Sequence, residues 1–140
     1  MGEAVPTQQT LVLIKPDAVR RALIGQILAR FEAKGLSVQA LQRRVIDGEL
    51  ADQHYAEHTE KSWYPPLREF ITSGPLVALI LTGDSAVEVV RTLIGPTDGR
   101  DAPGGTIRGD FALSNRENLV HASDSPQSAE REIELWFGSH

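Results

Sequence analysis

The amino-acid sequence predicts an α/β fold in which one sheet is covered by helices on one or both faces. Two continuous apolar runs of strand length, at residues 10–14 and 76–81, predict buried strands. Elsewhere apolar residues recur every three or four positions, which is typical of amphipathic helices. The two patterns alternate along 140 residues without a repeat or a linker, and this length suits a single core. We therefore predict one domain over residues 1–140.

The first third of the chain contains two predicted strands and one helix. Residues 1–9 are expected to form a flexible arm. The strand at 10–14 carries Lys15 at its C-terminal end, where the following proline stops it. Apolar positions from residue 24 to 31 lie on one face of a predicted helix, which ends before a glycine. Alternation over residues 36–45 then predicts a half-exposed strand.

The middle third contains three predicted helices around the second buried strand. Asp47 is placed to cap a helix that reaches Glu57, and residues 67–71 predict a short helix. Ser85 and Glu88 have the spacing of a capping box, in which each side chain bonds the other residue's backbone N–H. We therefore expect a further helix to begin after Ser85.

The last third begins with a turn-rich loop at residues 96–106. Leu119 and Val120 then begin a short buried strand. Ser125 is a natural N-cap, and the proline after it suits the first position of a helix. The apolar periodicity predicts that this final helix runs to Phe137.

Composition excludes several classes of protein. The net charge of −5, from 14 basic and 19 acidic residues, argues against non-specific nucleic-acid binding. The absence of cysteine excludes disulfides and thiolate metal sites, and it suits a reducing compartment. No apolar run approaches the ~20 residues that a membrane helix needs, and the first ten residues do not resemble a secretory signal. We therefore predict a cytoplasmic protein without a membrane or nucleic-acid partner.

His121 is the strongest candidate for a catalytic residue. An imidazole at the end of a strand can face a cleft and act as a base, a metal ligand or a nucleophile near neutral pH. Taken alone, a half-buried structural histidine explains this residue equally well. Lys15, Arg91, Thr97 and Arg108 would form a cationic clamp for a polyphosphate if the fold brings them together, and composition does not show that it does.

A second pattern suggests a different chemistry. His54, Glu57 and His58 match H-x-x-E-H, which on one continuous helix would present two imidazoles to zinc and a carboxylate as base. Zinc would require a third protein ligand, and the simpler interpretation is the polar face of a surface helix. Neither a P-loop nor a dinucleotide-binding fingerprint occurs.

Several motifs in a fixed order resemble the nucleoside diphosphate kinase family, from Thr10 to Phe137. They are Leu-Ile-Lys15-Pro-Asp, His54-Tyr55, Gly-Thr106-Ile-Arg108-Gly-Asp110-Phe, Asn118-x-x-His121-x-Ser123-Asp124, and Glu132 ahead of Leu-Trp136-Phe137. The resemblance implies a ferredoxin-like α/β sandwich, an α+β fold whose four-stranded antiparallel sheet is covered by helices.

The same resemblance implies an activity. It is the reversible ping-pong transfer of the γ-phosphoryl group from a nucleoside triphosphate, typically ATP, to a nucleoside diphosphate, through a phosphohistidine on His121. Mg²⁺ would accompany the nucleotide. The family also implies self-association to a homo-oligomer, a hexamer or alternatively a tetramer. A catalytically silent nucleotide-binding module on the same fold remains an alternative, as does the zinc peptidase.

The resemblance implies a role for each matching residue. Beside the nucleophile His121, Glu132 would orient the ring with help from Ser123, and Asp124 would reach Mg²⁺ through water. The family's nucleotide-binding and active-site positions are matched by Lys15, Arg91, Thr97 and Arg108 at the phosphates, Asn118 and Lys15 at the ribose, Trp63 at the base, and Tyr55 near the catalytic histidine.

Three residues depart from the family pattern. Ala122 stands where the family usually has glycine, and it would be strained if its φ were positive. Asn115 replaces a small apolar residue that covers the second face of the base. Gly99 replaces a proline in the loop at 96–106, which predicts a softer loop and a softer assembly.

Overall fold

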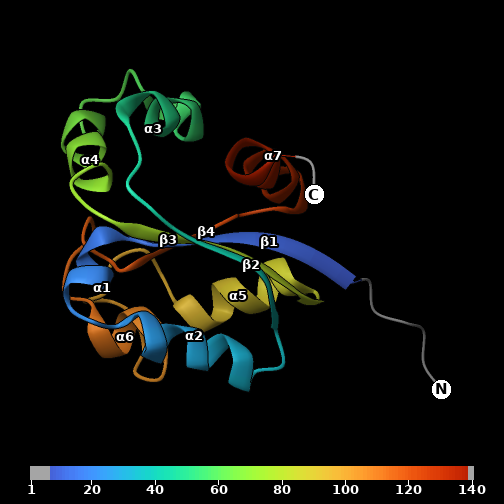
Figure 1. Ribbon diagram of the computed structural model, residues 1–140. Coiled ribbons are helices and arrows are strands. Elements are labelled where there is room, and N and C mark those ends of the chain that lie inside the picture. The colour runs from blue at the N-terminus through green and yellow to red at the C-terminus, as the bar shows by residue number, and fades with distance from the viewer. Residues whose placement is uncertain (1–6, 139–140) are drawn as a thin grey trace.

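A computed structural model describes residues 7–138, which form an antiparallel sheet of four strands in the order β2-β3-β1-β4. The strands are β1 (Thr7–Ile14), β2 (Ser37–Arg44), β3 (Leu76–Asp84) and β4 (Val120–Ala122). Helices pack on both faces (Figure 1). The predicted ferredoxin-like sandwich is therefore confirmed.

The helices form two layers, one on each side of the sheet (Figure 1). One layer contains α1 (Pro16–Arg20), α2 (Ile24–Ala33), α5 (Ala86–Ile94) and α6 (Ile107–Phe111). The other contains α3 (Gly48–His54), α4 (Tyr64–Ile71) and α7 (Pro126–Phe137), with the 3₁₀ turn η1 (Ala56–His58) between α3 and α4. Within residues 7–138 no helix has the length and apolar character to cross a membrane.

The sheet separates two apolar cores because successive side chains of a strand point to opposite faces. In β1, Val12 and Ile14 belong to the core beneath α2 and α5, whereas Leu11 and Leu13 belong to the core beneath α3 and α7. This central strand is fully buried over its last residues, so it reads in the sequence as a continuous apolar run.

The same alternation decides where His121 points. Its neighbours Val120 and Ala122 belong to the core beneath α5. His121 lies opposite Leu13 in the β1–β4 ladder, and Leu13 faces α7. The strand therefore directs the imidazole toward the α3 and α7 side of the sheet.

The predicted arm at residues 1–9 is wrong for its last three residues. Thr7 pairs with Asp84 and Gln9 with Thr82, because β3 extends beyond its apolar run and supplies partners for the polar start of β1. Residues 1–6, the rest of that prediction, lie outside the described part of the chain.

The three predicted helix starts at Asp47, Ser85 and Ser125 are confirmed, but the predicted side-chain cap forms at only two of them. Asp47 accepts a hydrogen bond from the Leu50 N–H at 2.9 Å, and Ser125 accepts one from the Ser128 N–H at 3.0 Å. Ser85 precedes α5 as expected, but its φ of 51° is left-handed and its side chain makes no cap bond. The capping box therefore does not form.

Candidate active site

The sequence-predicted site residues converge on one cavity of about 900 Å³, a size that suits a small-molecule ligand. It lies over the C-terminal end of β1 and the short strand β4, between α3, α5 and the loops around α6. Its lining includes every predicted site residue except Ser123: Lys15, Tyr55, Trp63, Arg91, Thr97, Arg108, Asn118, His121, Asp124 and Glu132.

At the floor of this cavity, β4 and α7 hold a hydrogen-bonded group of three side chains. His121 Nε2 lies 3.3 Å from Glu132 Oε1, and Ser123 Oγ donates to the same oxygen at 2.6 Å. Ser123 is fully buried, which explains why it does not line the cavity. Among the described residues no group bonds His121 Nδ1, so this nitrogen is free to face the cavity.

Glu132 remains a carboxylate although it is only 6% exposed. Burial alone would raise its pKa, but the hydrogen bond and charge of His121, the charge of His54 and the bond from Ser123 together lower the pKa of this carboxyl. A carboxylate accepts hydrogen bonds only. The His121 nitrogen that faces it therefore carries the proton.

A second group of side chains lies at the end of β1. Lys15 Nζ donates to Asn118 Oδ1 at 2.9 Å, and the Asn118 amide donates to the backbone oxygens of Thr97 and Asn115 at 2.9 and 3.0 Å. Asn118 therefore connects the lysine to the loop that carries Thr97, which places both beside the same end of the cavity.

Arg108 on α6 is held by backbone carbonyls. Its guanidinium donates to the oxygens of Val120 at 2.6 Å, Gly95 at 3.0 Å and Asn118 at 3.3 Å. Burial, and then the charge of Arg91, lowers the pKa of Arg108 to about 10, so it stays charged at neutral pH. The pKa of Lys15 is lowered to about 8, chiefly by burial and then by the charge of Arg108. The charge of Asp17 acts in the opposite direction and raises it.

A strained turn positions Asn118 between these cations. Leu119 has a φ of 77°, and the Val120 N–H donates to the Asn118 oxygen at 2.9 Å, which together describe a γ-turn. Asp17 Oδ2 accepts the Leu119 N–H at 3.1 Å, and the Leu119 oxygen accepts the Lys15 N–H at 2.8 Å. Both backbone polar groups of the strained residue are therefore bonded to the start of α1.

The remaining predicted groups lie at the rim. Arg91 on α5 is exposed and makes one long hydrogen bond, to the Ala122 oxygen at 3.4 Å. Asp124 is exposed, and a hydrogen bond from Ser128 is the main reason why its pKa is lowered. Thr97 is exposed on the loop after α5. All three have side chains accessible to a ligand.

Trp63 stands at the cavity mouth with 48% of its surface exposed. Its ring centroid lies 5.1 Å from that of His58, and the two rings are tilted by 47° relative to each other. Asn115 lines the cavity as well. An aromatic side chain that belongs to the core is normally buried. A large ring that is exposed beside a cavity instead suits stacking on a flat ligand.

His54 and Tyr55 enclose His121 from the α3 side. The His54 ring centroid lies 4.6 Å from that of His121, and the Tyr55 centroid lies 6.4 Å from it. Burial raises the pKa of the Tyr55 phenol, with a contribution from Glu132, so the phenol keeps its proton. Sequence reasoning missed this place for His54, because its spacing to Glu57 and His58 drew attention to zinc instead.

The H-x-x-E-H interpretation is not supported. Helix α3 ends at His54, and Glu57 and His58 belong to the separate turn η1. His54 is only 4% exposed and lies against Trp136 and His121. The three residues therefore do not share a helix face, which the zincin arrangement requires.

Three cations line the cavity that sequence reasoning missed: Arg100, Arg116 and Arg131. Arg100 pairs with Asp98 at 2.6 Å, and Arg131 donates to the backbone oxygens of Gln53 and His54. Nothing in their local sequence separates them from surface arginines, so only the fold could reveal them.

The structure shows the surroundings of two residues that depart from the family pattern, Ala122 and Gly99. Outside glycine, the described residues with positive φ are Ala22, Ser85 and Leu119, so Ala122 carries no such strain. Gly99 is buried, and a Cβ there would overlap the carbonyl of Ala112. Close packing therefore disfavours a side chain at Gly99, and the softer assembly stays a prediction.

Comparisons with known proteins agree with this geometry. A family model described as nucleoside diphosphate kinase matches residues 8–140. The chain is 68% identical to a nucleoside diphosphate kinase of a Nocardioides species, over 92% of this chain and 96% of that one. It is 58% identical to a nucleoside diphosphate kinase of Staphylothermus marinus, over 94% and 93% of the two chains.

Solved structures show the same similarity. The nucleoside diphosphate kinase of Halobacterium salinarum in complex with CDP has a TM-score of 0.93 at 46% identity, covering 96% of this chain and 90% of that one. The apo enzyme of Encephalitozoon cuniculi has a TM-score of 0.92 at 39% identity, over 94% and 90%. This chain therefore belongs to the nucleoside diphosphate kinase family.

Proposed function

We propose that this chain catalyses reversible transfer of the γ-phosphoryl group from a nucleoside triphosphate, typically ATP, to a nucleoside diphosphate, through a phosphohistidine on His121. One observation carries the proposal. The His121 ring is fixed by Glu132 through Nε2, and its other nitrogen is free at the floor of a cavity that Lys15, Arg91 and Arg108 also line.

In the first half-reaction the lone pair of His121 Nδ1 attacks the γ-phosphorus. The Nδ1–P bond forms as the bond from phosphorus to the β,γ-bridging oxygen breaks, and the nucleoside diphosphate leaves with that electron pair. The ring keeps its Nε2–H and becomes cationic. The Glu132 carboxylate accepts this N–H and stabilises the charge that develops.

The second half-reaction is the reverse, with a different nucleoside diphosphate as acceptor. Because the donor leaves before the acceptor enters, one cavity serves both nucleotides. Lys15 and Arg108 are held by hydrogen bonds before any ligand arrives. In a loose phosphoryl-transfer transition state, such fixed positive groups supply most of the stabilisation.

Recognition of the nucleoside needs few contacts in this proposal. Asn118 and Lys15 would bind the ribose hydroxyls, Tyr55 would bound the site next to His121, and Trp63 would stack on the base. Stacking is insensitive to base identity because every base has a π-face. Selectivity among nucleoside diphosphates is therefore expected to be low.

Mg²⁺ is proposed to arrive with the nucleotide. The cavity rim presents the carboxylate of Asp124, and its pKa is lowered, so it is ionised at neutral pH. One carboxylate beside substrate phosphates suits Mg²⁺, which keeps most of its water. Bound there, Mg²⁺ would neutralise charge on the phosphates, and Asp124 would hold it through water.

We also propose that the chain is cytoplasmic and forms a homo-oligomer, a hexamer or alternatively a tetramer. Leu41 on the edge strand β2 is 48% exposed and Val45 just after it is 67% exposed. Exposed apolar residues beside the open edge of a sheet favour contact with another chain.

Intact mass spectrometry before and after mixing with ATP·Mg²⁺ tests the function. Wild type should gain one phosphoryl group, which is acid-labile and base-stable, and lose it again to added nucleoside diphosphate. His121→Ala should gain none and support no transfer. A phosphate that persists in His121→Ala would overturn the nucleophile, and the absence of phosphoprotein in wild type would instead favour the silent nucleotide-binding module.

A further inference from the structure

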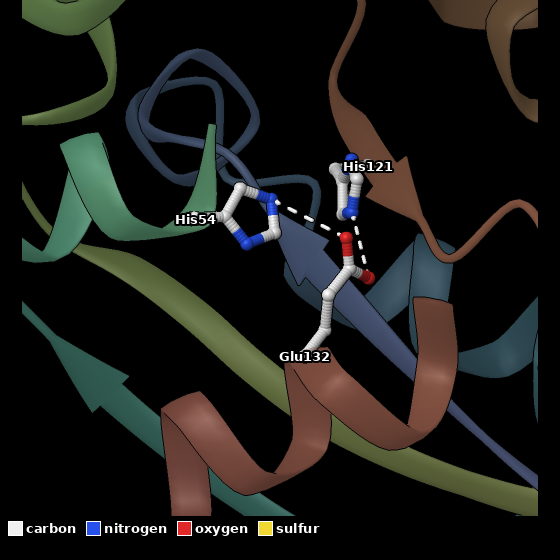
Figure 2. Close-up of side chains that lie close together, drawn as sticks. All are labelled: His54, His121 and Glu132. Atoms are coloured by element: carbon white, nitrogen blue, oxygen red, sulfur yellow. Dashed lines mark hydrogen bonds and ion pairs between the residues drawn. The ribbon is translucent and has the colours of Figure 1, made fainter. Parts of the chain in front are cut away.

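His54 touches the proposed nucleophile and its carboxylate, yet the chemistry above does not use it. Figure 2 shows the Glu132 carboxylate between the two imidazoles, with His54 Nε2 directed at Oε2 over 3.9 Å and His121 Nε2 at Oε1. We propose that His54 is a positioning residue whose neutral ring donates from Nε2 to Glu132 and so fixes the carboxylate that orients His121. The inference rests on the proposed role of His121.

Trp136 determines which nitrogen of His54 carries the proton. The indole N–H of Trp136 lies 2.9 Å from His54 Nδ1, and both groups are buried. An indole nitrogen can only donate, so Nδ1 must accept and the ring proton must reside on Nε2. Glu132 and Trp136 are four residues apart on α7, one helical turn, and therefore reach the two nitrogens of one ring.

The His54 ring is neutral at physiological pH. Its pKa is lowered to about 3, chiefly by burial and then by the charges of His121, Arg131 and Lys15, while the charge of Glu132 opposes them. A neutral ring can donate to Glu132 without adding a second cation beside His121. The negative charge of the carboxylate therefore remains available to the imidazolium that phosphorylation creates.

Glu132 needs a contact on its second oxygen. Ser123 and His121 both bond Oε1, and the terminal torsion of a glutamate is soft, so bonds to one oxygen leave the carboxylate free to turn. His54 Nε2 is buried without a hydrogen-bond partner among the described residues. A buried donor favours any movement that supplies an acceptor.

Oε2 is the acceptor that this N–H faces. Catalytic hydrogen bonds are often long before the substrate binds and tighten in the reacting complex. As His121 becomes cationic and draws Oε1 toward itself, a bond from His54 to Oε2 would hold the plane of the carboxylate. The 3.9 Å separation is therefore the open state of this bond.

A metal ion is the competing occupant of this cluster. One ligand atom from each of His54, His121 and Glu132 falls within 4.8 Å of the others, which is close enough for coordination. A metal requires a lone pair on His54 Nε2. Trp136 assigns a proton to that nitrogen, so hydrogen bonding excludes coordination by His54.

Two substitutions at His54 distinguish a role as hydrogen-bond donor to Glu132 from a role in packing alone. In His54→Gln the amide nitrogen can occupy the position of Nε2 and donate to Glu132. In His54→Asn the shorter amide reaches only the position of Nδ1, where its oxygen can still accept from Trp136. Both are neutral amides, so each controls for the other.

The measurement is the single-turnover rate of His121 phosphorylation by ATP·Mg²⁺, together with the dissociation constant of ADP. We expect His54→Asn to slow phosphorylation about 10- to 100-fold, the value of a hydrogen bond to a charged group. ADP affinity should not change, and His54→Gln should restore most of the rate. Equal rates in the two variants, or a fast His54→Asn, would overturn the role.

Imidazole nitrogen NMR tests the tautomer in wild type without relying on either variant. Protein labelled with ¹⁵N in its 4 histidines should show one ring that is unprotonated at Nδ1, protonated at Nε2 and unchanged between pH 5 and 8. A protonated Nδ1 or a titrating ring would refute the proposal. Failure of wild type to become phosphorylated would refute the proposed function instead, so the two failures are distinguishable.

Discussion

Lys15 holds its proton less firmly in the folded protein than in the unfolded chain. Its pKa falls from 10.5 to about 8, chiefly through burial. Between these values the unfolded state binds more protons, so the free energy of unfolding gains from this group as pH rises through that window. At neutral pH the buried ammonium therefore costs stability, on the order of 3 kcal/mol, which nucleotide phosphates can offset.

The activity should fall where Lys15 loses its charge. We expect kcat/KM for ATP, which reports the free enzyme, to decrease as pH rises through about 8. The deprotonated amine no longer attracts phosphate oxygens. A pH profile measured for wild type and for Lys15→Met checks this. The variant should have a low kcat/KM without that limb, and the same limb in both would assign it to another group.

Leu119 shows strain in the backbone that positions Asn118. At a φ of 77° an alanine is disfavoured by ~1–2 kcal/mol, whereas glycine is not. We therefore expect Leu119→Gly to be at least as stable as Leu119→Ala in urea unfolding, the reverse of the usual order. Both should be less stable than wild type, because the side chain is fully buried. A markedly more stable alanine variant would contradict the strain.

At the scale of residues, the sequence predicted which residues belong to the site but not all of the contacts that they make. Spacing alone could not show that Lys15, Arg91, Thr97 and Arg108 converge, because they come from separate elements; family resemblance supplied that expectation. The local pattern around His54 suggested a metal ligand. Its true environment depends on Trp136, 82 positions away in the chain.

At the scale of elements, two glycines in the loop after α5 differ in the space around them. A Cβ on Gly99 would overlap Ala112, whereas one on Gly104 meets nothing within 4 Å. We expect Gly99→Ala to destabilise by about 1–3 kcal/mol, as overpacking does, and to weaken ADP binding through Thr97 on the same loop. Gly104→Ala is the matched control and should be neutral or slightly stabilising. Equal effects in thermal unfolding would contradict this account of Gly99.

The long elements were predictable and the short ones were not. Strands β1 and β3 contain long buried apolar runs, and helices α2 and α7 have long apolar stripes. These patterns are long enough to identify each element from the sequence. Helices α1 and α6 have five residues each, too few for a period. α6 is fixed by the cap from Thr106 to the Gly109 N–H at 2.9 Å, and α3 ends at His54 against the sequence pattern.

At the scale of the whole molecule, the open edge of β2 should decide self-association. Leu41 and Val45 are exposed there, and a charge placed among apolar contacts is costly. We expect the Leu41→Glu, Val45→Glu double variant to have a smaller mass by light scattering than wild type. Gln42→Glu, which is also exposed on this strand, should leave the mass unchanged. A wild type that is already monomeric would rule out the proposed oligomer.

The arrangement of the layers follows from the sequence only in part. Alternating strand and helix patterns predicted a sheet covered by helices, but they left strand order and direction open. The order β2-β3-β1-β4 depends on long-range pairing that periodicity does not encode. That pairing also selects the face on which His121 emerges, and so it decides whether the ring meets α7 or α5.

The two tryptophans occupy opposite environments: Trp63 is half exposed at the cavity mouth, and Trp136 is buried against His54. Their fluorescence should therefore separate by wavelength, with the exposed indole emitting further to the red. A base lying on Trp63 would quench that component, while the buried indole would respond to changes in its own hydrogen bond. The native chain thus carries two separate fluorescence signals. Trp63 reports ligand entry, and Trp136 reports its hydrogen bond to His54 below the cavity.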